Sequence, residues 1–152
     1  MTQHPDSPST RVLLIDPSKS ERTLWAAQLR RCSSAYEILE AADGKSGLAL
    51  YRSRRIDCVV LELDFLNQTG FRTLMELVPI ASRPQIAVIV LTKELPRGVW
   101  ELVTQVGAYA CLVKPYTRVQ KHKRKSFVPI RHFDKNGIGK INPNYLFVEF
   151  RQ

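Results

Sequence analysis

The chain has 152 residues, with 23 lysines and arginines against 14 aspartates and glutamates, so its formal net charge at neutral pH is +9. This length suits one domain with an additional segment, and a 44% share of hydrophobic residues excludes a chain that is disordered throughout. No apolar run is long enough to span a bilayer, and the polar residues 1–10 are expected to be disordered and show no signal peptide. Three cysteines at unrelated spacings fit reduced thiols in a cytoplasmic protein.

The positive charge is concentrated at the end of the chain. Residues 118–152 hold 9 basic and 2 acidic side chains, a net of +7, which leaves +2 for residues 1–117. This shift in composition predicts a boundary after residue 117 and a basic C-terminal extension at 118–152.

Short apolar runs alternate along the chain with segments of helical pattern. The runs predict buried strands at 11–15, 36–39, 58–63, 85–91 and 110–113. The helical segments predict one helix capped by Ser18 or Ser20, followed by others at 45–53, 71–78 and about 96–106. This alternation predicts an α/β fold whose mostly parallel sheet is covered on both faces.

Polar side chains end four of the predicted strands. They are Asp16, the segment Glu62 to Asp64, Thr92 and Lys114. One polar residue at a strand end carries little weight, because the chain leaves the core there. Four at the carboxyl edge of one parallel sheet, with complementary chemistry, predict a ligand site.

Five segments occur in the order and at the spacings typical of the response-regulator receiver family, the CheY-like domains. They read VLLIDPSKSER, EAADGKSGLAL, DCVVLELDFLNQTGF, IAVIVLT and ACLVKPY. The chain therefore resembles a receiver domain over residues 11–117. The resemblance implies a flavodoxin-like, doubly wound, five-stranded parallel sheet. It also implies a non-enzymatic signalling module of a two-component phosphorelay, whose partner is a histidine kinase, an output domain or a second copy of the chain.

The resemblance assigns a role to each matching position. Asp16 aligns with the first of two acidic residues that hold Mg²⁺, and Glu62 stands where the family has its phosphorylated aspartate. Thr92 aligns with the hydroxyl that contacts the phosphoryl group, and Lys114 with the lysine that neutralises it. Phosphoryl transfer depends mostly on positioning and charge neutralisation, which explains these residue types.

Four positions depart from the family pattern. Glu62 replaces the acceptor aspartate, and Pro17 replaces the second acidic metal ligand, so Mg²⁺ binding through Asp16 and Glu62 is expected to be weakened. Lys93 follows Thr92 where a small residue is usual, and is expected to cover the pocket or pair with Glu62. Cys111 occupies the position of the switch aromatic, for which Tyr109, expected on the same strand face, is a weak substitute.

These departures predict a pseudo-receiver that works without phosphorylation, with a Glu62–Lys114 ion pair imitating the phosphorylated state. A leftover ion pair without signalling meaning is an equally weighted alternative. Phosphorylation on Asp64, which points to the same face as Glu62, is a minor alternative.

The extension does not follow the family pattern. After Thr117 the family continues with an amphipathic helix, but the apolar residues of 118–133 lack helical spacing and Pro129 would break a helix. The last helix is therefore expected to be missing or displaced. The sheet face that it would cover is expected to meet residues 145–150, which alternate like a strand, or a partner chain.

A basic run in the extension supports an alternative function. Its candidates for contact with nucleic-acid phosphates are Lys121, Lys123, Arg124 and Lys125. In this alternative the protein is a nucleic-acid-binding transcriptional regulator with the receiver domain as dimerisation platform. A solvated linker, or an end that is foreign to the fold, explains the run as well.

Overall fold

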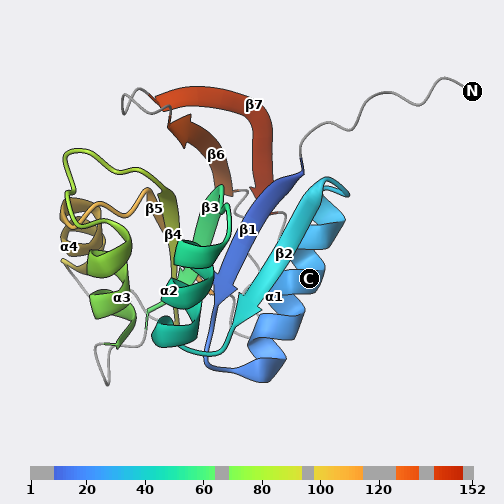
Figure 1. The fold of residues 1–152 in the computed structure, drawn as a ribbon, viewed down its shortest axis with the longest axis horizontal. Helices are drawn as coiled ribbons and strands as arrows, with labels where there is room; N and C mark the ends of the chain where they lie inside the picture. Colours follow the sequence, from blue (N-terminus) through green and yellow to red (C-terminus); the bar gives the residue numbers. More distant parts are fainter. Residues whose placement is uncertain (1–8, 64–68, 94–97, 115–125, 134–138, 149–152) are drawn as a thin grey trace, which may run out of the picture.

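The structure is a computed structural model, and it describes residues 9–63, 69–93, 98–114, 126–133 and 139–148. A wholly parallel five-stranded sheet in the order β2-β1-β3-β4-β5 forms its centre (Figure 1), which confirms the predicted doubly wound fold. Its strands are β1 (Thr10–Ile15), β2 (Tyr36–Ala41), β3 (Cys58–Glu62), β4 (Ala87–Thr92) and β5 (Ala110–Val113). The helices between them are α1 (Lys19–Cys32), α2 (Gly44–Ser53), α3 (Thr69–Leu77) and α4 (Val99–Gln105). Among the described helices, none has both the length and the apolar character needed to cross a membrane.

The boundaries of some elements differ from the prediction. Thr10, expected in the disordered start, belongs to β1, where it pairs with Tyr36 and is buried. The strand predicted at 85–91 begins only at Ala87, because Gln85 is still exposed. Residues 1–8 and the predicted helix start at 96 lie outside the described residues.

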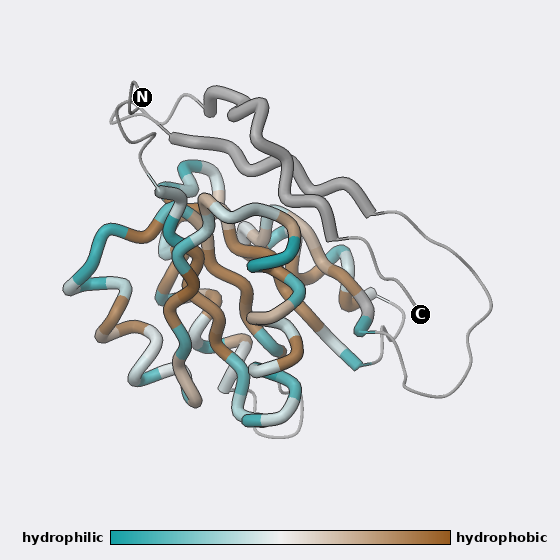
Figure 2. The backbone as a smooth tube through the Cα atoms, turned by 90° about the vertical axis from the view of Figure 1, so that its right-hand side faces the viewer, coloured by the Kyte–Doolittle hydropathy of each residue, from teal (hydrophilic) through white to brown (hydrophobic). Residues whose placement is uncertain are grey.

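The central strands β3 and β4 are buried at every position, as expected for strands covered on both faces. Figure 2 shows the hydrophobic segments gathered in the middle of the fold. On one face, α2, α3 and α4 pack on side chains such as Leu13, Val59 and Val88. On the other face, α1 packs on the alternate side chains of the same strands, such as Val12 and Val60. Period-two alternation thus divides each apolar run between two separate clusters.

Two helices begin close to the carboxyl edge of the sheet. The Ser18 hydroxyl accepts a hydrogen bond from the Glu21 amide and caps α1, and the Asp43 carboxylate accepts one from the Ser46 amide and caps α2. In α2, a Cβ added at Gly47 would lie 2.4 Å from Ile15 Cδ1, so glycine allows this helix to approach the end of β1. The first turns of α1 and α2 are therefore fixed next to the strand ends that carry the candidate site residues.

After β5 the described residues form an antiparallel hairpin of β6 (Ser126–Phe133) and β7 (Gly139–Val148). Residues 115–125, where the last helix of the family pattern would begin, lie outside the described residues, so a missing or displaced helix stays a prediction. The strand expected at 145–150 begins earlier, at Gly139, because the pairing with β6 continues to that residue. β7 lies against α1 and β6 against β4, which places the hairpin on the face that α1 covers. On that face Ile89 and Leu91 of β4 are each 1% exposed.

The packing of α1 predicts a contrast between two leucines of that helix. Leu29 is 1% exposed within the cluster beneath α1, whereas Leu24 is 54% exposed. Leu29→Ala should lower the free energy of unfolding by about 2–5 kcal/mol through lost burial and a cavity. Leu24→Ala, the matched control, should change it by less than about 0.5 kcal/mol. Urea unfolding measures both, and equal losses would contradict the assigned packing.

Candidate functional site

Four strands of the sheet bring the predicted site residues to one edge. Asp16 directly follows β1, Glu62 ends β3, Thr92 ends β4 and Lys114 directly follows β5. The Lys114 amide donates to the Thr92 carbonyl at 2.7 Å, which continues the pairing of β4 with β5 up to the site. All four side chains are buried, at 8% exposure or less. The parallel topology therefore gathers residues that lie far apart in the sequence.

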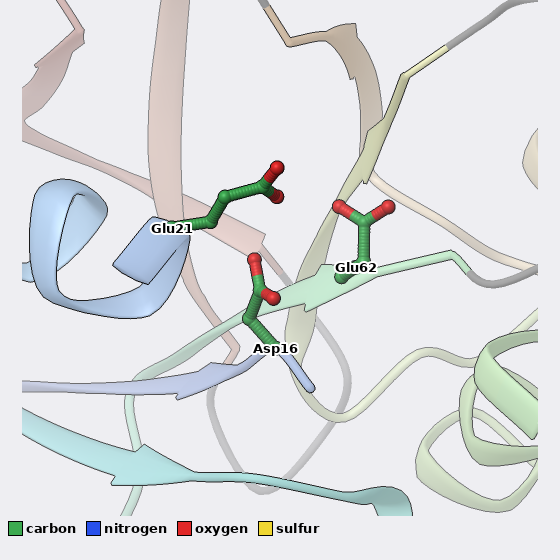
Figure 3. Close-up of side chains that lie close together, drawn as sticks. All are labelled: Asp16, Glu21 and Glu62. Atoms are coloured by element: carbon green, nitrogen blue, oxygen red, sulfur yellow. The ribbon is translucent and has the colours of Figure 1, made fainter. Parts of the chain in front are cut away.

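The ammonium of Lys114 lies among three carboxylates. It donates hydrogen bonds to Asp16 Oδ2 at 2.7 Å and to Glu21 Oε2, and its Nζ lies 2.5 Å from Glu62 Oε2. We call Asp16, Glu21 and Glu62 the carboxylate cluster, and Figure 3 shows the three side chains directed into a common space. The predicted Glu62–Lys114 ion pair is thus present as part of a larger arrangement.

The backbone of the β1–α1 connection fixes Asp16 in place. Asp16 Oδ1 accepts a hydrogen bond from the Ser18 amide at 2.8 Å, and the Asp16 carbonyl accepts one from Arg22 Nη1 at 2.6 Å. One carboxylate oxygen of Asp16 therefore faces the start of α1 and the other faces Lys114. Pro17, which lies between Asp16 and Ser18 in the sequence, is exposed and offers no side-chain oxygen.

Glu21 is a site residue that the sequence reasoning missed. It lies in the first turn of α1, where its acidic side chain also interacts favourably with the helix dipole. The pattern of polar residues at strand ends does not include it, because it belongs to a helix. The signal that could have revealed Glu21 is its place one turn after the Ser18 cap, because the helix that follows a parallel strand begins at the same sheet edge.

Lys93 takes a different partner from the one considered. Its Nζ lies 3.5 Å from Glu21 Oε1, so it pairs with Glu21 instead of Glu62, while the alternative that Lys93 covers the pocket stays a prediction. The side chain of Lys93 is 61% exposed and lies on the solvent side of Glu21. The cluster therefore has a buried cation, Lys114, and a surface cation, Lys93.

The residues of the expected switch lie on opposite sides of the sheet. Cys111 packs in the cluster beneath α2, α3 and α4, where burial raises the pKa of its thiol to about 11. Tyr109 precedes β5 and packs on the α1 side, so the expectation that it shares a face with Cys111 is wrong. The alternation that places Cys111 starts only at Ala110. Tyr109 is therefore not positioned to replace the aromatic that Cys111 displaces.

Some predicted residues lie outside the described part of the chain. Asp64, the alternative acceptor, is one of them, and so are Lys121, Lys123, Arg124 and Lys125 of the basic run. Phosphorylation at Asp64 and nucleic-acid binding through the extension therefore stay predictions.

The cluster shifts the pKa of several of its members. Burial and the nearby Asp16 and Glu21 charges hold the pKa of Glu62 above its ordinary value, although Lys114 opposes them. Burial would also raise the pKa of Glu21, but the hydrogen bond and charge of Lys114, together with Lys93, lower it overall. Burial would lower the pKa of Lys114, but its hydrogen bonds to the cluster outweigh burial and raise it. Lys114 is therefore held firmly in its charged form.

The carboxylate cluster has the ligand type but not the free space for a magnesium ion. Carboxylate oxygens are the ligands that Mg²⁺ prefers, and one oxygen of each member lies within 4.8 Å of the others. However, the Lys114 ammonium already pairs with all three carboxylates. As arranged, these residues do not fit a divalent cation.

Comparison with known proteins agrees with this fold. The family model described as "Response regulator receiver domain" matches residues 12–124. The chain is similar to PilH of Pseudomonas aeruginosa, with 29% identity over 54% of this chain and 66% of PilH. It is also similar to the transcriptional regulatory protein PdtaR of Mycobacterium tuberculosis, with 32% identity over 70% of this chain and 50% of PdtaR. The chain thus spans between half and two thirds of the length of these relatives.

Solved structures of receiver-type proteins have the same fold. The chemotaxis protein CheY4 of Vibrio cholerae superposes with a TM-score of 0.61 and 28% identity, over 71% of this chain and 88% of CheY4. The receiver domain of a DNA-binding response regulator from Colwellia psychrerythraea superposes with a TM-score of 0.63, and its 21% identity supports the fold alone.

The buried ion pairs predict that Lys114 is required for stability. Lys114→Met should lower the free energy of unfolding by about 3–5 kcal/mol, because it leaves three carboxylates at one edge without their shared cation. Lys93→Met removes a charge of the same sign from an exposed position and should cost less than about 1 kcal/mol. Urea unfolding at neutral pH measures both, and similar costs for the two variants would show that the buried pairs are not decisive.

The raised pKa of Glu62 predicts a pH-dependent effect of Glu62→Gln. Above the ordinary value of 4.5, the folded chain still binds a proton that the unfolded chain has lost. The stability of the natural chain therefore falls in this range as pH rises through the folded-state pKa of Glu62. Glu62→Gln removes this contribution, so its stability relative to the natural chain should rise with pH from 4.5 upward. Urea unfolding at a series of pH values measures the difference, and a relative stability that falls with pH would contradict the assigned environment.

Proposed function

The chain belongs to the response-regulator receiver family, and from this premise we propose that its receiver domain signals through protein contacts without being phosphorylated. Receiver domains are modules of two-component signalling. The observation that carries the proposal is the state of Glu62, the residue at the acceptor position. It is 8% exposed, and its Oε2 atom lies 2.5 Å from Lys114 Nζ.

Phosphoryl transfer requires an acceptor oxygen that the donor can reach, and a cation that neutralises the charge which develops on the phosphoryl oxygens. The Glu62 carboxylate extends one methylene further than an aspartate and is already paired with the lysine that should neutralise the phosphoryl group. Both requirements are therefore compromised at the same two residues.

The missing second acid adds to this effect. Pro17 supplies no oxygen beside Asp16, and Lys114 pairs with Asp16 at 2.7 Å. A cation-dependent reaction at Glu62 would have to begin by breaking these pairs. We propose that the Glu62–Lys114 pair instead keeps the domain in one signalling state at all times.

Signalling in this mode needs a surface for a protein partner. On α4, Trp100 and Leu102 are 45% and 46% exposed, so this helix presents two large apolar side chains to the solvent. An exposed tryptophan is a frequent anchor of protein interfaces. We propose that α4 and the adjacent β5 contact a kinase, an output domain or a second copy of the chain, and that the module turns over no substrate.

The proposal predicts the outcome of incubation with acetyl phosphate and Mg²⁺. The natural chain should gain no acid-labile phosphoryl group, measured by intact-mass spectrometry at neutral pH. The double variant Pro17→Asp with Glu62→Asp restores both residue types of the family pattern and is the matched comparison, which should gain the group. A stable adduct on the natural chain would overturn the proposal, and its location at residue 62 or 64 would identify the acceptor.

A further inference from the structure

The carboxylate cluster surrounds an ammonium group of this chain itself. Lys114 has three N–H donors, and its Nζ pairs with three carboxylates that come from the end of β1, the first turn of α1 and the end of β3. Glu21 contributes the carboxylate that lies on the helix. It matches no position to which the family resemblance gives a role.

We propose that the Lys114 ammonium is the resident cation of this edge in place of a divalent metal ion, and that Glu21 replaces the carboxylate lost at Pro17. This inference concerns the same site as the proposed function and deepens it. Its test contains no phosphoryl donor, so it can fail while phosphorylation-independent signalling still stands.

The position of the ammonium supports the proposal. Lys114 is 6% exposed, and its Nζ lies 2.7 Å from Asp16 Oδ2 and 2.5 Å from Glu62 Oε2. Glu62 Oε2 is buried, and among the described residues its close contact with Nζ is the interaction that balances its charge. A divalent ion bound to the same carboxylate oxygens would lie next to the Lys114 ammonium. Two neighbouring positive charges in a buried site repel each other strongly.

The arrangement of Glu21 shows how the third carboxylate is held. Its Oε2 accepts the hydrogen bond from Lys114, while its Oε1 pairs with Lys93 at 3.5 Å. Glu21 therefore bridges the buried and the exposed lysine. The two lysines therefore compensate most of the negative charge of the three carboxylates without a metal ion.

The test measures binding of Mn²⁺ alone by the loss of the free-ion signal in electron paramagnetic resonance. Lys114→Met should bind Mn²⁺ at least about tenfold more tightly than the natural chain, because it frees three carboxylates and removes a neighbouring positive charge. Lys93→Met is the matched control and should tighten binding by less than about threefold, because its charge is exposed.

The role of Glu21 is tested in the same variant. Adding Glu21→Gln to Lys114→Met should weaken the gained Mn²⁺ binding by at least about tenfold, because an ion of this kind favours charged oxygen ligands. Equal Mn²⁺ affinities of Lys114→Met and Lys93→Met would overturn the assignment of Lys114. Unchanged affinity after Glu21→Gln would overturn the assignment of Glu21.

A measurement on the natural chain decides the matter if Lys114→Met does not fold. Ligands that bind only the folded state raise the unfolding temperature. The natural chain should unfold at the same temperature in MgCl₂ and in NaCl of equal ionic strength. A rise in MgCl₂ alone would show a divalent ion bound to the folded chain and would overturn the proposal.

Discussion

The buried ammonium of Lys114 forms ion pairs that connect the elements at the carboxyl edge of the sheet. Lys114 follows the last strand of the sheet, and it joins a residue 98 positions earlier, Asp16, with one 93 positions earlier, Glu21. The carboxyl ends of β1, β3 and β5 and the start of α1 therefore meet at a single atom. Because each of the three acids would otherwise be an incompletely compensated charge, the arrangement of these elements and the charge of the edge depend on the same contact.

The rest of the fold keeps this edge in place. The apolar strands β3 and β4 are buried on both faces, and α2 approaches the end of β1 closely at Gly47. On the α1 face, the hairpin of β6 and β7 lies against β4 and α1. The sheet is therefore covered on both faces, and the closely packed strands fix the positions of the site residues at their ends.

The sequence predicted the fold and most of this edge for a simple physical reason. Short apolar runs identify parallel strands, and the ends of parallel strands must meet, so Asp16, Glu62, Thr92 and Lys114 could be placed together. Glu21 could not be found in this way, because it belongs to a helix and reaches the edge only through its first turn. Tyr109 was misplaced because the alternation of β5 begins one residue after it. The hairpin was not foreseen in full, because Pro129 and Pro143 interrupt the pattern of its two strands.

The central claim is that Lys114 provides the positive charge of the carboxylate cluster. A crystal structure determined from a solution that contains MgCl₂ tests it most directly. The account predicts Lys114 Nζ within hydrogen-bonding distance of Asp16 and Glu21, paired with Glu62, and no ion among the three carboxylates. A magnesium ion coordinated by Asp16 and Glu62, with the Lys114 side chain turned away, would contradict it.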